Sequence, residues 1–190
     1  MASIITATTT SGLTQSADNS GVLQLASGVG NLVTVPAVTG TAMVSGNMPA
    51  FSASINTAQT ISNATNTKVQ NGVENFDTNN CFDNTTNYRF TPTVAGYYQV
   101  NANLTLNGSS TSTVISSFIY KNGTTAIVAT QIPFNSGGSY VTAACSTVVY
   151  MNGTTDYLEQ YVWQNSGSTL TVLTGRFDLN SFSGSLVRAA

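Results

Sequence analysis

The stretch RFTPTVAGYYQVNANLTL, residues 89–106, contains a strand, a corner and a second strand. Pro92 has no N–H to donate and a fixed φ, so strand pairing is expected to stop after Phe90. Gly96 permits backbone geometry that a Cβ would hinder, which suits a tight corner. From Tyr98 onward apolar and polar residues alternate, which predicts a strand with one buried and one exposed face. The two adjacent tyrosines therefore point to opposite faces.

Short alternating runs broken by turn residues recur along the chain, whereas helix signals are nearly absent. Asn122-Gly123 lies between two β-rich runs, which is a strong hairpin signal. Asn152-Gly153 repeats this pattern, and residues 169–187 predict two further short strands. Many short strands with regular turns are typical of an all-β antiparallel sandwich or barrel.

A domain boundary is predicted at residues 45–47. The preceding segment is rich in Thr, Ser and Gly, lacks aromatic residues and carries one charge, at Asp18. We interpret residues 1–46 as an extended N-terminal appendage for anchoring or as a stalk, and 47–190 as the globular domain. In the alternative, residues 31–45 add a strand to the sheet of that domain.

Composition excludes several classes of function. Hydrophobic residues make up 41% of the chain and charged residues only 6%, with a net charge of −2. The five basic residues form no cluster, which argues against nucleic-acid binding. No apolar run approaches the ~18 residues of a membrane span, and the N-terminus lacks the features of a signal peptide. We therefore expect neither nucleic acid nor membrane insertion.

Catalytic groups are not evident in the sequence. There is no histidine, and no serine has a neighbour that marks it as an activated nucleophile. The acidic pairs Glu74/Asp77 and Asp156/Glu159 are interpreted as solvated loop pairs. We therefore predict a protein that is not an enzyme.

The two cysteines are expected to be thiols. Cys145 is in phase with Val141, Ala143 and Val149, which predicts a small buried core residue. A disulfide with Cys81 is the alternative.

Several short motifs follow one another over residues 51–186. They are Phe51-Ser52-Ala53, Lys68-Val69, Asn75-Phe76-Asp77, Phe90 with Pro92, Gly96, Tyr97 and Tyr98, Lys121-Asn122-Gly123, and Phe182-Ser183-Gly184-Ser185-Leu186. In this order they resemble the motifs of the globular head of complement C1q, one of the tumour necrosis factor-like jelly rolls. The resemblance implies an antiparallel jelly-roll sandwich for 47–190 and a homotrimer around a three-fold axis.

The chain departs from that family because it has no collagen-like Gly-X-Y stalk. Residues 28–44, GVGNLVTVPAVTGTAMV, instead resemble segments that precede such domains in structural proteins of tailed bacteriophages. This resemblance implies a structural and adhesion protein of the virion, assembled in the host cytoplasm as a tail fibre or a capsid decoration (head fibre). Its partners would be other virion proteins, through the appendage, and a glycan or protein of the host surface. The alternative is a secreted or cell-surface lectin-like module of cellular origin.

Two regions contain candidate ligand sites. Asp77, Asp83 and Asn84 lie in an oxygen-rich segment that suits calcium, and some members of the resembled family hold calcium. In the alternative, these residues make Asx turns and no cofactor or metal is bound. Phe134 and Tyr140 flank a Gly-Gly loop as candidate recognition residues, or else cap the sandwich.

Trp163 is the third recognition candidate. It alternates with Tyr157, Glu159 and Tyr161 along a predicted strand, so these four side chains share one face. That face is interpreted as a surface between subunits or as a surface on which sugars stack.

Overall fold

The computed structural model describes residues 23–26, 32–35, 43, 45–108, 113–134, 140–174 and 179–190. The chain divides into two compact units, Met1–Gly40 and Thr41–Ala190. In the first unit, β1 pairs antiparallel with β2, so the strand at residues 32–35 has its partner at residues 23–26. The strands are β1 (Leu23–Ala26) and β2 (Leu32–Val35).

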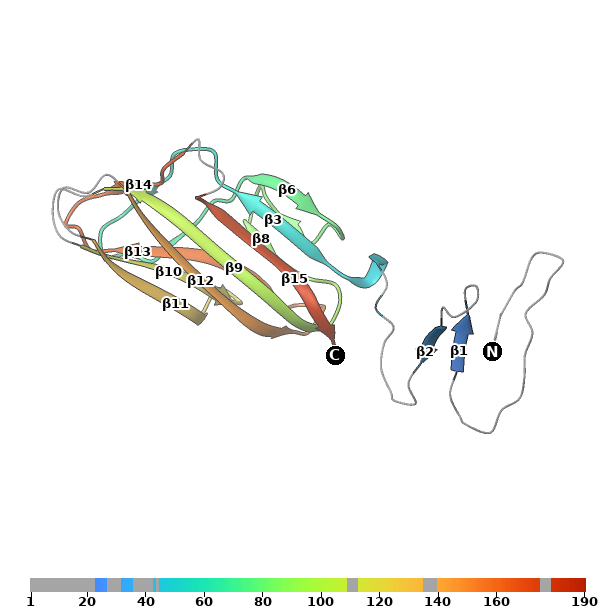
Figure 1. Cartoon of the computed structure of the whole chain (residues 1–190). Helices are drawn as coiled ribbons and strands as arrows, with labels where there is room; N and C mark the ends of the chain where they lie inside the picture. Colours follow the sequence, from blue (N-terminus) through green and yellow to red (C-terminus); the bar gives the residue numbers. More distant parts are fainter. Residues whose placement is uncertain are drawn as a thin grey trace. The chain divides into compact units, whose positions relative to one another are not determined.

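The second unit is an antiparallel β-sandwich with jelly-roll topology (Figure 1). One sheet has five strands in the order β12-β9-β15-β3-β6, and the other has the order β11-β10-β13-β8-β7 with β5 paired to β13. β14 and β4 form a separate two-stranded sheet. The elements are η1 (Ser45–Asn47), β3 (Ala50–Ser54), β4 (Thr60–Ile61), β5 (Thr67–Lys68), β6 (Val73–Asp77), β7 (Phe82–Asp83), β8 (Arg89–Phe90), β9 (Gly96–Asn107), β10 (Thr113–Lys121), β11 (Thr125–Phe134), β12 (Tyr140–Met151), β13 (Leu158–Gln164), β14 (Leu170–Thr171) and β15 (Ser181–Ala189).

The predicted corner after Phe90 is confirmed. β8 ends at Phe90 and β9 begins at Gly96, and β9 alternates between buried and exposed residues over most of its length. Tyr98 is fully buried, and its hydroxyl donates a 2.7 Å hydrogen bond to the carbonyl of Val94, which pins the corner to the strand. Tyr97 points to the other face and is exposed.

The predicted reason for Gly96 is half right. Its φ is not positive, so no left-handed geometry requires glycine here. A Cβ at this position would instead collide with the carbonyl oxygen of Arg188 and approach the side chain of Leu186. Glycine is needed because β15 passes too close for any side chain.

The two Asn-Gly pairs have different roles. Asn122 and Gly123 both have positive φ and join β10 to β11, which are paired, so the predicted hairpin is confirmed. The second pair, Asn152-Gly153, does not form a hairpin: β12 pairs with β9, and β13 pairs with β10 in the other sheet. This turn therefore carries the chain from one sheet to the other.

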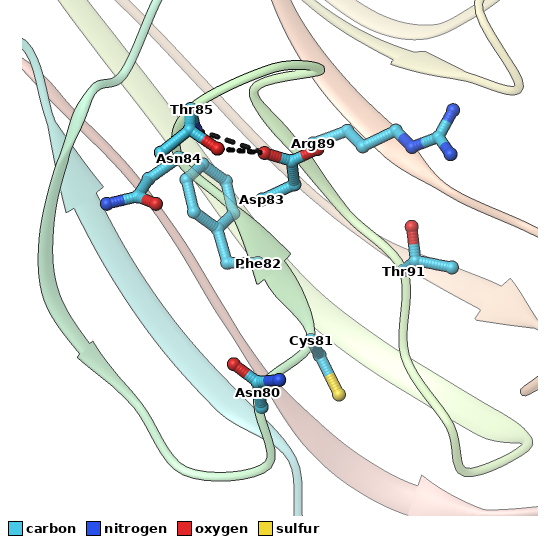
Figure 2. A pocket seen from close by; sticks show the side chains of 8 residues that line it. All are labelled: Asn80, Cys81, Phe82, Asp83, Asn84, Thr85, Arg89 and Thr91. Atoms are coloured by element: carbon cyan, nitrogen blue, oxygen red, sulfur yellow. Dashed lines mark hydrogen bonds between the residues drawn. The ribbon is translucent and has the colours of Figure 1, made fainter.

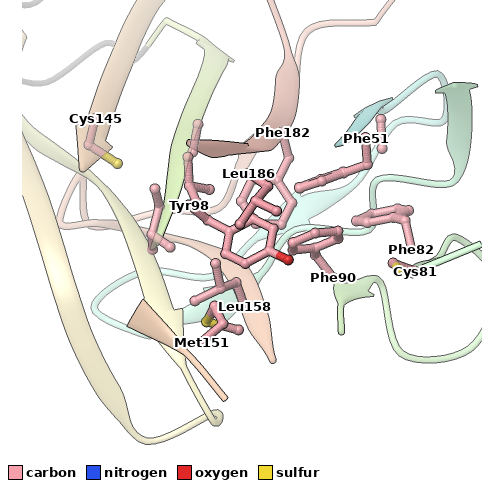
Figure 3. Packing of buried hydrophobic residues seen from close by; sticks show 14 residues of the cluster. Phe51, Cys81, Phe82, Phe90, Tyr98, Cys145, Met151, Leu158, Phe182 and Leu186 are labelled. Carbon is pink, nitrogen blue, oxygen red and sulfur yellow. The ribbon is translucent and has the colours of Figure 1, made fainter. Parts of the chain in front are cut away.

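Aromatic rings fill one part of the core (Figure 3). Phe51 stacks on Phe90 with ring centroids 4.3 Å apart and meets Phe182 edge-on at 5.0 Å. Phe90 in turn meets Tyr98 at 5.6 Å. These four residues come from three motifs of the C1q-like resemblance, so the spacing of those motifs reflects a single packed cluster.

A second apolar cluster lies beyond the first and includes Leu104, Ile115 and Val162. Gln160 is also fully buried; its side chain accepts a hydrogen bond from Asn71 and donates one to the carbonyl of Asn103. Cys145 is buried, as its phase predicts. Among the described residues, no helix is long and apolar enough to span a bilayer.

Candidate binding surfaces

Over β12, β9 and most of β15, the outward side of the five-stranded sheet is built from neutral and mostly small side chains. Buried and exposed residues alternate along its central strands, so the outward positions follow directly from the register. We call this surface the neutral face. Its residues are Tyr97, Gln99, Asn101 and Asn103 of β9, Ala144, Ser146, Val148 and Tyr150 of β12, and Ser181, Ser183 and Ser185 of β15.

Exposed apolar groups gather at one end of the neutral face. Tyr97 and Tyr150 lie opposite each other in the register, with rings edge-on at 5.5 Å, and are 45% and 44% exposed. Val148, two residues before Tyr150, is also exposed. Arg188 of β15 lies opposite Tyr97 at this end. Exposed rings and an isopropyl group with a single arginine beside them are typical of a surface that another protein covers.

The outward side of the six-stranded sheet has a different composition. Phe118 and Tyr120 of β10 lie beside Tyr161 and Trp163 of β13, and we call these four residues the aromatic row. The ring of Tyr120 lies 5.9 Å from Phe118 and 4.5 Å from Tyr161. All four residues are half-buried, so part of each remains open to solvent. The ring contacts join Phe118, Tyr120 and Tyr161, and Trp163 follows Tyr161 on the same side of β13.

Polar groups adjoin the aromatic row. Lys68 forms a 2.9 Å ion pair with Glu159, whose side chain is only 5% exposed. Tyr161 donates a 3.5 Å hydrogen bond to the same carboxylate, and Asn66 donates one of 3.2 Å to the hydroxyl of Tyr120. Burial, followed by the nearby Glu159 carboxylate, raises the pKa of Tyr161, so its hydroxyl stays protonated at neutral pH.

The interpretation of Asp156 and Glu159 as a solvated loop pair is wrong. Both are buried and each has its own cation: Asp156 pairs with Lys121 at 2.8 Å, and Glu159 with Lys68. Partial burial opposes ionisation of Asp156, but hydrogen bonds from Asn122, Lys121 and the backbone of Asn152 hold its pKa below the usual range. These carboxylates therefore stabilise turns and strands.

The segment proposed for calcium lines an open pocket, shown in Figure 2. Asp83 accepts hydrogen bonds from the backbone N–H groups of Thr85, Thr86 and Asn87, at 3.0, 2.9 and 3.1 Å. The N–H groups of Thr86 and Thr85 contribute most to holding the pKa of Asp83 well below its usual range. The carboxylate is thus already engaged in a turn.

Asp77 is engaged in a similar way, because its two oxygens accept the backbone N–H groups of Asn79 and Phe82. Asn84 lines the pocket beside Asp83 and Arg89. Within the part of the chain that the structure describes, no three His, Cys, Asp or Glu side chains gather as metal ligands. The geometry favours the Asx-turn alternative, and calcium remains an untested prediction.

The three predicted recognition residues do not meet in one place. Phe134 is 8% exposed and packs in the second apolar cluster, whereas Tyr140 is 59% exposed at the start of β12. The loop between them lies outside the described residues. Trp163 lies in the aromatic row on the other sheet, and its predicted neighbour Tyr161 lies there too.

Sequence reasoning missed Phe118 and Tyr120, although the signal was present. Every second residue of β10 points to the same side of the sheet, and on one side these are Ser116, Phe118 and Tyr120. Tyr161 and Trp163 of β13 lie on that same side. The pairing of Tyr97 with Tyr150 was also missed, because it depends on the register between β9 and β12.

No known protein-family profile matches the chain, and no curated protein sequence matches it. Solved structures do. The zebrafish complement 1qA globular domain matches at 16% identity, covering 75% of this chain and 98% of that one, with a TM-score of 0.47. Eiger TNF from S. frugiperda matches with a TM-score of 0.54 at 10% identity, covering 75% of this chain and 93% of that one. Murine APRIL at pH 5.0 matches with a TM-score of 0.55 at 7% identity, covering 74% of this chain and 99% of that one.

The fold is that of the tumour necrosis factor-like jelly rolls. The predicted fold class is therefore confirmed, and at these identities the likeness concerns the fold alone.

Proposed function

We propose that this chain is a non-enzymatic structural and adhesion protein of a tailed-phage virion, displayed as a homotrimer. The neutral face carries the proposal. β9 and β12 contain no charged residue, so copies that pack through these two strands meet neither charge repulsion nor the cost of burying an ion, and Arg188 of β15, opposite Tyr97, is the charged residue at the end of the face. The exposed end at Tyr97, Val148 and Tyr150 supplies apolar area for that contact.

Residues 1–46 attach the trimer to other virion proteins, as a tail fibre or as a capsid decoration. The heads then contact the host surface, where three weakly binding sites in each trimer, repeated over many copies, multiply the affinity of one. The resemblance of residues 28–44 to phage segments supports this location, and the low charge of the chain suits dense display.

Two measurements test the proposal. Light scattering of the full chain should give the mass of three copies at micromolar concentration, and a monomer there would contradict the assembly. Antibody labelling of purified virions under the electron microscope should place the protein on the tail or the capsid. Absence of label from virions would favour the alternative of a lectin-like module of cellular origin.

A further inference from the structure

The aromatic row is a fixed surface of suitable shape for a ring-shaped ligand. Phe118 and Tyr161 lie directly opposite each other on hydrogen-bonded strands, and Tyr120 contacts both rings. Side chains on paired strands lose little further freedom when a ligand binds, which lowers the entropic cost of recognition. The rings are inclined to one another, by 65° between Phe118 and Tyr120 and 43° between Tyr120 and Tyr161, so each offers its own face or edge to a ligand. The C–H-rich face of a sugar stacks on such aromatic side chains through apolar contact.

The charge of this surface selects among ligands. The charged groups beside the row are balanced: Lys68 and Glu159 form a 2.9 Å ion pair, and Arg89, opposite Glu159 on β8, has Asp83 opposite it on β7. A surface without net charge gives no advantage to an anionic ligand, so phosphate-rich and strongly acidic polymers are disfavoured. The Lys68 side chain is still 33% exposed and has further N–H groups to offer to neutral hydroxyls.

A buried hydroxyl provides an independent observation. Ser116 lies opposite Trp163 on the same side of the sheet and is fully buried, yet its Oγ has no hydrogen-bond partner among the described residues. Buried polar atoms without partners are uncommon and often mark a place where a water or ligand binds. Here the atom lies at the tryptophan end of the row.

From these observations we infer that the aromatic row binds a neutral hexopyranose glycan. The rings of Phe118, Tyr120, Tyr161 and Trp163 stack on the sugar faces, while Lys68, Asn66 and the tyrosine hydroxyls hydrogen-bond to sugar hydroxyls. This inference rests on the proposed adhesion function, because it names the ligand class that the displayed heads would meet on a host surface.

Trp163 makes the inference directly measurable, because it is the only tryptophan in the chain. The full-length protein is titrated with neutral oligosaccharides of glucose, mannose, galactose and N-acetylglucosamine while tryptophan emission is recorded. At least one series should produce a saturable change. Absence of a saturable change with all four series overturns the inference, and so does tighter binding of a sialylated oligosaccharide than of any neutral one.

Variants locate the site. Tyr161→Ala should weaken binding of the oligosaccharide that gives the response about tenfold, whereas Tyr161→Phe keeps the ring and should keep most of the affinity. Phe76→Ala removes a half-exposed ring from β6 in the other sheet and should leave affinity unchanged. If Tyr161→Ala binds like the parent at an unchanged melting temperature, the sugar binds elsewhere and the inference fails.

If Tyr161→Ala fails to fold, Tyr120→Ala serves as the second variant. It removes the ring that contacts both Phe118 and Tyr161, and it should weaken binding of the same oligosaccharide by a similar factor. An unchanged affinity in this folded variant likewise overturns the inference.

The outcome is separable from the proposed function. If the antibody labels virions but the protein gives no response to these sugars, the proposed location stands and the proposed ligand is wrong. If the protein binds a neutral sugar through the row but the antibody does not label virions, the proposed ligand stands and the proposed location is wrong.

Discussion

The two outward faces of the sandwich use the same alternation of residues for different purposes. The neutral face presents serine, asparagine and alanine over three adjacent strands, with Tyr97 and Tyr150 at one end. The aromatic row instead places four rings on two strands, beside the ion pair of Lys68 and Glu159. Small neutral side chains leave a level surface suited to another copy of the protein, whereas packed rings beside hydrogen-bonding groups suit a small ligand.

The difference teaches that exposure alone does not identify a binding site. Tyr97 and Tyr150 are more exposed than the rings of the row, yet the ring contact that the structure gives them is a single edge-on pair at 5.5 Å. In the row, Tyr120 contacts both Phe118 and Tyr161, and all four rings are half-buried. Preorganisation of this kind is what gives a small ligand its affinity.

The largest expected effect concerns the start of β9, where β15 of the same sheet passes close to Gly96. Gly96→Val should lower the free energy of unfolding by about 4 kcal/mol, because its side chain would collide with the backbone of β15 at Arg188. Thermal and denaturant unfolding followed by circular dichroism measure this. Gly72→Ala is the matched control, since the nearest atoms to an added Cβ there are at ordinary contact distance. A heat-stable Gly96→Val protein would remove the close approach from the explanation of the corner.

The second prediction concerns the neutral face alone. Val148→Asp should dissociate the proposed trimer, because a carboxylate buried without a partner between copies costs about 3 kcal/mol of association free energy. Light scattering should then give a monomer whose tryptophan response to sugar is retained. Ala58→Asp, at an exposed loop position, should remain trimeric. A trimeric Val148→Asp protein would mean that copies meet through another surface.

The third prediction concerns the end of the sandwich where the sheets are tied together. Asp156 bonds Lys121 of β10, which also donates to the carbonyl of Tyr150 in β12. Asp156→Asn should lower the free energy of unfolding by about 2 kcal/mol at neutral pH. Because the folded pKa of Asp156 lies below its unfolded value, its contribution is present above the ordinary carboxyl range and is lost as the pH falls.

Unfolding measured from neutral to acidic pH checks this. The difference between Asp156→Asn and the parent should shrink as the pH falls. A difference that stays constant would show that the carboxylate charge contributes nothing to the tie.

The sequence was sufficient for the elements whose local signals agree with the fold. The corner at Gly96, the alternation of β9 and the hairpin at Asn122-Gly123 depend on neighbouring residues, so they are readable one stretch at a time. Asn152-Gly153 gave the same local signal, but which sheet receives the next strand depends on long-range pairing. A tight turn does not specify its strands' partners.

The candidate sites were harder to predict for the same reason. Tyr161 and Trp163 share a strand, and their common face was predictable from spacing of two. Phe118 and Tyr120 join them only through the register between β10 and β13. Phe134 is buried because the second apolar cluster receives it, and the flanking glycines carried no information about that packing.

The smallest expected effect separates two recognition candidates that the sequence treated alike. Tyr140 is 59% exposed on the sheet of the neutral face, and Trp163 lies in the aromatic row on the opposite sheet. Tyr140→Ala should change the free energy of unfolding by less than about 0.5 kcal/mol, because its ring buries little area. It should also leave binding of labelled protein to host cells unchanged, whereas Trp163→Ala should reduce that binding severalfold, since stacking is lost. Both variants are compared at equal trimer mass, so that lost avidity does not imitate lost recognition. Reduced binding by Tyr140→Ala with an unchanged melting temperature would move recognition to the start of β12, and the two faces would then both contact the host.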